Sequence, residues 1–346
     1  MFTMKTGRKI SYCQALNEAF HSQMQKNKNM IIYGIEDKMF GSNEKLLEKF
    51  GNKRFFFTPL SEDMLTGFAL GSAISGVVTV YNHIRVDFLL LGMNQIANTI
   101  SSYCYATNGK HPVPLIIRAV IGRGWGQGYQ HSKSLQSIFS HIPGIKVIMP
   151  TTPYDAKGMM ISALNDNNPV ICLEHRWLYW QEGVVPKQDY KIPFGKAAIL
   201  RTGNDISIIC TSWMNVEACQ ASDFLKNYGI SCEVIDVRSI NPLDKHSLIK
   251  SVKKTRRCII ADYDWLFCGL SAEISDLIYS NVTNLKNPIQ RIGFAATPCP
   301  TSRNLENSFY PNSRNIIKII SKMLKRKINF NKISLFSHEN VFKGPF

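Results

Sequence analysis

The sequence lacks several features that would place it in a specialised class. No hydrophobic stretch approaches the roughly 18 consecutive apolar residues of a membrane-spanning helix. Its first residues, MFTMKTGRKISYCQ, contain no apolar signal core, so we expect a cytoplasmic location and no membrane association. The nine cysteines are odd in number and include no C-x-x-C pair, which favours reduced thiols over a disulfide framework or a zinc site.

Acidic residues are also few, since 25 Asp and Glu stand against 41 Lys and Arg, for a net charge of +16. Part of the excess is local, because eight basic residues and a single acid, Glu339, follow Pro311. A basic surface by itself is weak evidence for a nucleic-acid partner, and no RNA- or DNA-binding motif accompanies it. We therefore expect no nucleic-acid function, and the role of the basic tail stays open.

The pattern of apolar residues predicts an α/β fold with two domains. Apolar, β-branched runs alternate with segments of helical period, as in mostly parallel sheets flanked by helices. Among the expected helices are Phe88–Cys104 and Pro153–Leu164. Turn residues without helical period mark a linker, after which the alternation restarts. The predicted division is residues 1–180, a linker at 181–193, a second domain at 194–324 and a basic tail at 325–346.

The most informative stretch is TPLSEDMLTGFALGSAISG at residues 58–76. Gly67 and Gly71 lie one helical turn apart, so one face of the predicted helix lacks side chains and allows another backbone to approach. Locally, Ser61 is expected to cap this helix and Glu62 to complement its dipole. The alternative is that Glu62 has a catalytic role, and the local pattern favours the structural interpretation.

A family resemblance over the rest of the chain favours the catalytic role of Glu62 instead. TPLSE and GFALG are accompanied, in order, by IIYGIED, PVPLIIR, YQHSKS, SHIPGIKVIMP, DAKG, ALNDNNPVICLEH, SCEVIDVRSINPLD and LSAEI. Together they resemble the β subunits of the thiamine-diphosphate-dependent 2-oxo acid dehydrogenases, within the transketolase superfamily. The resemblance runs from about Ile10 to Leu324. It implies a pyrimidine-binding-type domain followed by a transketolase C-terminal-type domain.

The resemblance also implies the site residues. Glu62 matches the glutamate that hydrogen-bonds the aminopyrimidine of the coenzyme, where it promotes the tautomer that forms the reactive ylide. Phe88 matches the aromatic residue that stacks on the pyrimidine, although core packing is the competing interpretation. Ile84 and the Leu60 main chain match the surrounding pocket. Glu36 matches an acid near the coenzyme, or else is a solvated loop carboxylate.

Two further groups of residues match the family. His131, in YQHSKS, corresponds to an active-site histidine that is able to hydrogen-bond the substrate or an acyl intermediate as a neutral ring. ALNDNNP resembles a loop whose main-chain carbonyls hold potassium. The residues implied for that ion are Leu115, Ala163, Leu164, Asp166 and Asn168. An ordinary tight turn explains the same sequence equally well.

One element of the family's site is missing from this chain. The Mg²⁺ that binds the coenzyme's diphosphate is normally held by a GDG motif with a following NN, and no GDG occurs here. The resemblance therefore implies that an α subunit supplies the Mg²⁺ and diphosphate site, in an α2β2 assembly. It also implies decarboxylation of a 2-oxo acid and acyl transfer to a lipoyl acyltransferase.

Departures from the family pattern leave the substrate and the acceptor open. YNHIRVDFLLL places Asn82 and Leu91 where an acid and a polar residue are usual, and AVIGRGWGQGYQ carries Arg123. Arg123 either binds an anionic substrate group or solvates its loop. The alternative function is the β half of a lipoyl-independent decarboxylase, ketol-transferase or carboligase. A non-catalytic scaffold that keeps the fold is the third hypothesis.

Overall fold

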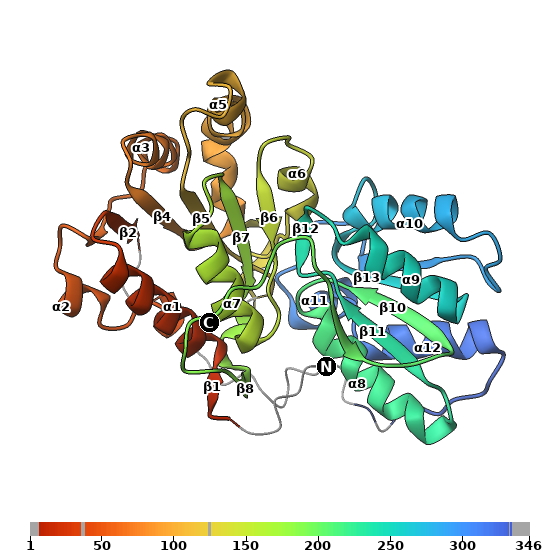
Figure 1. Ribbon diagram of the computed structural model, residues 1–346. Helices are drawn as coiled ribbons and strands as arrows, with labels where there is room; N and C mark the ends of the chain where they lie inside the picture. Colours follow the sequence, from red (N-terminus) through yellow and green to blue (C-terminus); the bar gives the residue numbers. More distant parts are fainter. Residues whose placement is uncertain (1–6, 36–38, 124–125, 332, 334–346) are drawn as a thin grey trace.

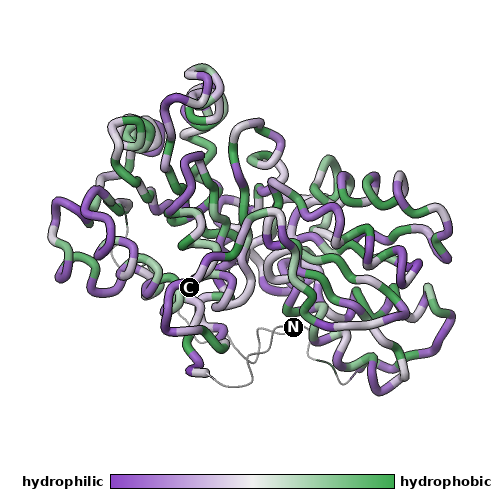
Figure 2. Tube along the Cα trace, in the orientation of Figure 1, coloured by the Kyte–Doolittle hydropathy of each residue, from purple (hydrophilic) through white to green (hydrophobic). Residues whose placement is uncertain are grey.

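The protein, seen in a computed structural model, consists of two α/β halves that lie side by side (Figure 1). The structure describes residues 7–35, 39–123, 126–331 and 333. Each half is built on one mostly parallel sheet with helices on its faces, which confirms the predicted fold class. The strands of both sheets are largely hydrophobic, as Figure 2 shows. No helix in the described part of the chain is long and apolar enough to cross a bilayer.

The first sheet has seven strands in the order β12-β6-β7-β5-β4-β2-β3. The strands are β2 (Met30–Gly34), β3 (Phe55–Phe57), β4 (Val78–His83), β5 (Leu115–Ile121), β6 (Lys146–Ile148), β7 (Val170–His175) and β12 (Ser239–Asn241). All neighbours pair in parallel except β12, which comes from the second half of the sequence and adds antiparallel to β6. The second half therefore completes the sheet of the first. A separate antiparallel pair joins β1 (Lys9–Ser11) to β8 (Glu182–Val184).

Two of the helices around this sheet, α1 and α7, begin at residues whose side chains cap them. The side chain of Ser11 accepts a hydrogen bond from Gln14 at the start of α1, and Thr152 does the same for Asp155 in α7. The longer helices are α1 (Tyr12–Lys26), α3 (Glu62–Ile74), α5 (Ser101–Ala106) and α7 (Pro153–Leu164). The short ones are η1 (Met39–Gly41), α2 (Leu46–Phe50), α4 (Val86–Leu89), η2 (Leu90–Gly92), η3 (Gln95–Ile100), η4 (Gly128–Gln130), α6 (Gln136–Ser140) and η5 (Arg176–Trp180).

The helix expected at 88–104 is present but irregular. It divides into α4, the 3₁₀ turn η2, the π-helical turn η3 and α5. The change falls where the segment packs closely on α3, since a Cβ at Gly92 would lie 2.5 Å from Oγ1 of Thr66. A change of hydrogen-bond register inside a helix commonly marks a constrained or functional segment.

The second sheet has five strands in the order β14-β13-β10-β11-β9. They are β9 (Ala198–Arg201), β10 (Ile206–Cys210), β11 (Cys232–Asp236), β13 (Cys258–Trp265) and β14 (Gln290–Phe294), with β9 antiparallel at the edge. The accompanying helices are α8 (Met214–Leu225), η6 (Lys226–Tyr228), α9 (Lys245–Thr255), α10 (Leu270–Asn281), α11 (Arg303–Phe309) and α12 (Ser313–Leu324).

Buried polar contacts fasten the two halves together. On α6, Nε2 of Gln136 donates to Asp262 at 2.9 Å, and the Ser137 hydroxyl donates to Asp264 at 2.8 Å. Burial raises the pKa of both acids, to about 8 for Asp264. In a buried environment a protonated carboxyl has a lower free energy than an ionised one. The helix that follows His131 is therefore fixed to the second half rather than free to move.

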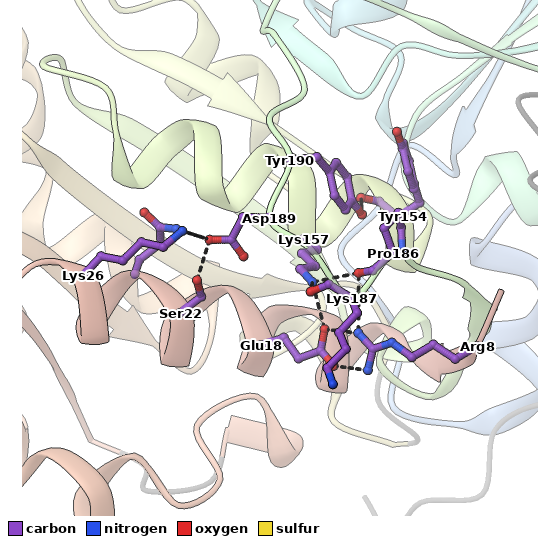
Figure 3. A network of polar contacts seen from close by, with 11 residues as sticks. Arg8, Glu18, Ser22, Lys26, Tyr154, Lys157, Pro186, Lys187, Asp189 and Tyr190 are labelled. Carbon is purple, nitrogen blue, oxygen red and sulfur yellow. Dashed lines mark hydrogen bonds and ion pairs between the residues drawn. The ribbon is translucent and has the colours of Figure 1, made fainter.

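A second polar network ties residues 186–189 to α1 and α7 (Figure 3). The buried ammonium of Lys157 donates to Glu18 at 3.0 Å and to the carbonyls of Pro186 and Lys187 at 2.9 and 3.0 Å. Nearby, Lys26 contacts Asp189 at 2.6 Å. Part of the segment predicted as a linker is thus held firmly against the first half.

Replacing Lys157 with Met should lower the free energy of unfolding by about 1–3 kcal/mol, because two carbonyls and Glu18 lose a buried donor. Urea denaturation followed by circular dichroism measures this change. Lys53→Met, at an exposed position, is the control and should have little effect. Equal midpoints for the two variants would contradict the role assigned to Lys157.

Candidate active site

Several residues predicted for the coenzyme site lie on segments that leave one edge of the first sheet. Strands β2, β4 and β5 run parallel and in register, with Gly34 opposite Asn82 and Asn82 opposite Arg118. Their carboxyl ends therefore meet at a common edge, where ligands bind in open α/β sheets. Ile84, Phe88 and His131 all lie on segments that leave this edge. Glu36, which follows β2, lies outside the described residues.

Glu62 is the first residue of α3 and is half-buried. Its negative charge acts to raise the pKa of both Tyr81 and His83. The carboxylate therefore lies near the end of β4. Within the described part of the chain, the Glu62 carboxylate has no hydrogen-bond or ion-pair partner. Ser61 makes no capping hydrogen bond through its side chain, so the expected cap is wrong. A half-buried, unpaired carboxylate at a strand edge is available to a ligand.

His83 lies at the end of β4, close to this carboxylate. Its Nδ1 lies 3.0 Å from the Arg85 carbonyl, so this nitrogen carries the proton and donates it. Its Nε2 is buried without a hydrogen-bond partner in the described residues. Burial lowers the pKa of His83 to about 4, against the opposing effect of the Glu62 charge. His83 is thus a neutral ring at physiological pH.

The structure brings Phe88 and His131 into direct contact. Their ring centroids lie 5.1 Å apart in an edge-to-face arrangement with an interplanar angle of 76°. Phe88, on α4, is half-buried, as are His131 and Ile84. Leu60, just before α3, is 71% exposed. Phe88 thus has one ring edge on His131 and retains an accessible surface, which a wholly buried core residue would lack.

A small charge cluster surrounds this aromatic pair. Nζ of Lys133 donates to Asp87 at 3.1 Å, while Nε of Arg85 lies 3.9 Å from the same carboxylate. The buried Arg85 guanidinium also donates to the Gly122 carbonyl at 2.6 Å, which links the loop after β4 to the end of β5. Burial, followed by the positive charge of Arg85, lowers the pKa of His131. This keeps His131 neutral near pH 7.

Arg123 serves neither of the two roles expected for it. It is fully buried and its guanidinium donates to Glu306 of α11 at 3.0 Å, and also to Asn307. It stacks over the ring of Tyr310 as well, at 5.4 Å. Arg123 therefore joins the two halves of the molecule. It neither solvates its loop nor is exposed to bind an anionic substrate group.

The residues implied for a potassium ion lie together around one turn. Asp166 N donates to the Ala163 carbonyl at 3.0 Å, Asp166 Oδ1 accepts from Asn168 N at 2.9 Å, and Lys146 contacts Asp166 at 2.5 Å. The Val113 amide binds the Asn167 carbonyl at 2.8 Å, which fastens this turn beside Leu115 at the start of β5. Leu164 ends α7 just before it. An ordinary stable turn explains these contacts. The potassium site therefore stays a prediction.

Sequence reasoning missed three ionisable residues near the site, His83, Arg85 and Lys133. For His83 and Arg85 the available signal was NHIRVD, a run of polar and charged residues at the end of a buried strand. Such a run in an otherwise apolar segment indicates a buried electrostatic arrangement rather than a solvated loop.

Comparison with known proteins matches both halves of the chain to transketolase-type domains. Residues 8–181 match the family model described as the pyrimidine-binding domain of transketolase, and residues 195–316 match the transketolase C-terminal domain. The β subunit of acetoin:2,6-dichlorophenolindophenol oxidoreductase from Cupriavidus necator is 36% identical over 333 residues, covering 92% of this chain and 98% of the relative.

A second relative is named for a different activity. The pyruvate dehydrogenase E1 component subunit beta of Rickettsia conorii is 34% identical over 319 residues, covering 91% of this chain and 98% of the relative. The chain belongs to the family of β subunits of thiamine-diphosphate-dependent 2-oxo acid dehydrogenases. This membership confirms the resemblance noted in the sequence.

A solved structure shares the fold of the family. A split-gene transketolase, described as an inactive beta4 tetramer, superimposes with a TM-score of 0.75 at 20% identity and covers 92% of this chain and 100% of its own. At that level of identity the likeness concerns the fold alone.

The environment of His83 predicts a pH dependence of stability. Its pKa of about 4 in the folded protein lies below the unfolded value of 6.5, so the unfolded chain binds the proton first as pH falls. The free energy of unfolding should therefore decrease between pH 6.5 and 4, by about 3 kcal/mol from this residue.

His83→Asn, which retains a donor for the Arg85 carbonyl, should flatten this decrease, as measured by urea denaturation across the pH range. His111→Asn, at an exposed position, is the matched control and should leave the slope of the wild type. A slope for His83→Asn as steep as that of the control would refute the assignment.

Proposed function

We propose that this chain is the β half of a two-chain thiamine-diphosphate enzyme that decarboxylates a 2-oxo acid and passes the acyl group to a lipoyl partner. The observation that carries the proposal is the unpaired, half-buried carboxylate of Glu62 near Tyr81 and His83, at the sheet edge from which the segments of Phe88 and His131 also leave. Relatives whose names specify pyruvate dehydrogenase and acetoin oxidoreductase subunits support the class of reaction.

The residues at this edge fit the aminopyrimidine end of the coenzyme. Glu62 would share a proton with the pyrimidine ring, while Phe88, Ile84 and the Leu60 main chain would form the surrounding pocket. The buried hydroxyl of Tyr81 and Nε2 of His83 lack hydrogen-bond partners in the described residues, so polar groups remain available beside Glu62. When bound, thiamine diphosphate supplies a nucleophilic carbon and an electron sink for decarboxylation.

His131 would act on the substrate side of the same site. Its lowered pKa favours a neutral imidazole, which both donates and accepts hydrogen bonds at pH 7. Its contact with Phe88 fixes the position of the ring. We therefore assign His131 the role of orienting the substrate or holding a proton during acyl transfer.

An α subunit would complete the site from the other side of α3. The outer face of this helix exposes Met64 and Phe68, and the neighbouring Leu60 and Leu91 are also exposed. A Cβ at Gly71 would meet nothing within 4 Å, so the surface is flat and open there. An exposed apolar face with a glycine suits a close helix contact. We propose that this α chain holds Mg²⁺ and the diphosphate in an α2β2 assembly.

The ion at the Asp166 turn and the lipoyl acceptor are finer parts of the proposal. Main-chain carbonyls around Leu115, Ala163, Leu164, Asp166 and Asn168 would hold potassium. A lipoyl-independent decarboxylase, ketol-transferase or carboligase is the alternative, favoured by Asn82 and Leu91 at positions that are usually polar or acidic. Product formation by the assembled pair without a lipoyl domain would select this alternative.

Glu62→Gln should reduce the activity of the assembled pair by about 10²- to 10⁴-fold, because an amide is unable to exchange the proton. Steady-state decarboxylation with saturating coenzyme measures the effect, and gel filtration checks that the pair still assembles. Asp63→Asn, its exposed neighbour, should stay near wild-type activity. Full activity in an assembled Glu62→Gln pair would remove Glu62 from the mechanism and favour the scaffold hypothesis.

Gly71→Leu should weaken association with the α chain by at least about tenfold, because the added side chain keeps the two surfaces apart. Folding should be unaffected, since the new Cβ meets no neighbour within 4 Å. Ser280→Leu, on the exposed end of α10, is the matched control. Calorimetric titration of each variant with the α chain distinguishes them, and wild-type affinity for Gly71→Leu would place the interface elsewhere.

A further inference from the structure

A pocket of about 700 Å³ lies between the segment that carries His131 and the second half of the molecule. One wall is formed by residues 129–133, and the others come from the loop after β13 and the loop after β14. Its volume falls within the range of about 300–1,000 Å³ that is usual for sites of small molecules. No residue that lines this pocket belongs to the proposed pyrimidine pocket or to the α3 surface, and Lys133 is the one that also takes part in the charge cluster near His131.

The walls from the second half are apolar and aromatic. Trp265, Phe267 and Phe294 line them, together with Ala296 and Cys299. Phe267 is 91% exposed, which is unusual for so large an apolar side chain. Tyr129, on the opposite wall, is 58% exposed. Two accessible rings at the mouth of a pocket provide a surface for the apolar body of a ligand.

The wall next to His131 is polar and carries a positive charge. Among the described lining residues, Lys133 is the only charged one. Its ammonium binds the Tyr129 carbonyl at 2.7 Å and shares the Asp87 carboxylate with Arg85, so two positive charges stand against one negative charge. The buried hydroxyl of Ser132 lies in the same wall and faces the Cys299 thiol and the Tyr310 hydroxyl. An acceptor that carries negative charge would be attracted to the Lys133 ammonium.

We propose that this pocket is a binding site for an amphipathic monoanion, such as a medium-chain or aromatic carboxylate. The apolar body lies against Trp265, Phe267 and Phe294, and the carboxylate accepts a hydrogen bond from the Lys133 ammonium. Binding is non-covalent, because burial raises the pKa of the Cys299 thiol and keeps it protonated. The site is separate from the coenzyme pocket, and two of its lining residues, Ser132 and Lys133, directly follow His131 in the chain.

Calorimetric titration of the full chain with octanoate, and separately with 3-phenylpropionate, tests the proposal. We expect saturable binding at one site, and binding of the neutral analogue octanamide about tenfold weaker or more. Lys133→Met should weaken octanoate binding by a similar factor. Ala296→Trp, which fills the pocket from an exposed position, should abolish it, whereas Ala106→Trp on the exposed end of α5 is the matched control.

Several outcomes would overturn the proposal. They are absence of binding, equal affinity for octanoate and octanamide, and unchanged binding by Ala296→Trp. The titration is repeated with the assembled αβ pair, because a protein partner is the other candidate occupant. Loss of octanoate binding on assembly would show that the pocket belongs to a subunit interface and not to a ligand. These results do not depend on catalytic activity, so they are independent of the proposed function.

Discussion

The parallel pairing of β2, β4 and β5 is the constraint on which the candidate site depends. Because these strands run in one direction and in register, the segments that follow them leave the sheet at one edge. Residues far apart in the sequence, such as Phe88 and His131, thereby come into ring contact. The Arg85 guanidinium then binds the Gly122 carbonyl across this edge and fixes two of the exit loops to each other.

The second half of the molecule supports this arrangement from one side. Asp262 and Asp264 hold α6, and Glu306 holds Arg123, so contacts on both sides of His131 along the chain lead to the second half. Buried carboxyls that are protonated or paired with a guanidinium avoid the cost of an isolated charge. Such rigidity would favour binding of the proposed α chain, because fewer groups of this half of the site need to become ordered on association.

The sequence predicted the periodic elements well and the edges of the sheets poorly. The helix Pro153–Leu164 was predicted with the bounds it has, because proline and threonine mark its start and its apolar pattern is strong. The edge strands β9 and β12 were missed: each is short, and β12 pairs with a strand from the other half of the chain, which no local pattern reveals. Glu62, Phe88 and His131 were identified by family resemblance. The roles of Arg85 and Arg123 depend on distant partners and needed the three-dimensional structure.

In the proposed function, Glu62 provides half of a coenzyme site whose diphosphate end belongs to another polypeptide. Calorimetry with thiamine diphosphate and Mg²⁺ tests this most directly when the chain, its α partner and their mixture are titrated in turn. The account predicts weak or undetectable binding to this chain alone and tight binding, at one coenzyme per αβ pair, to the mixture. Tight binding to the isolated chain would contradict it.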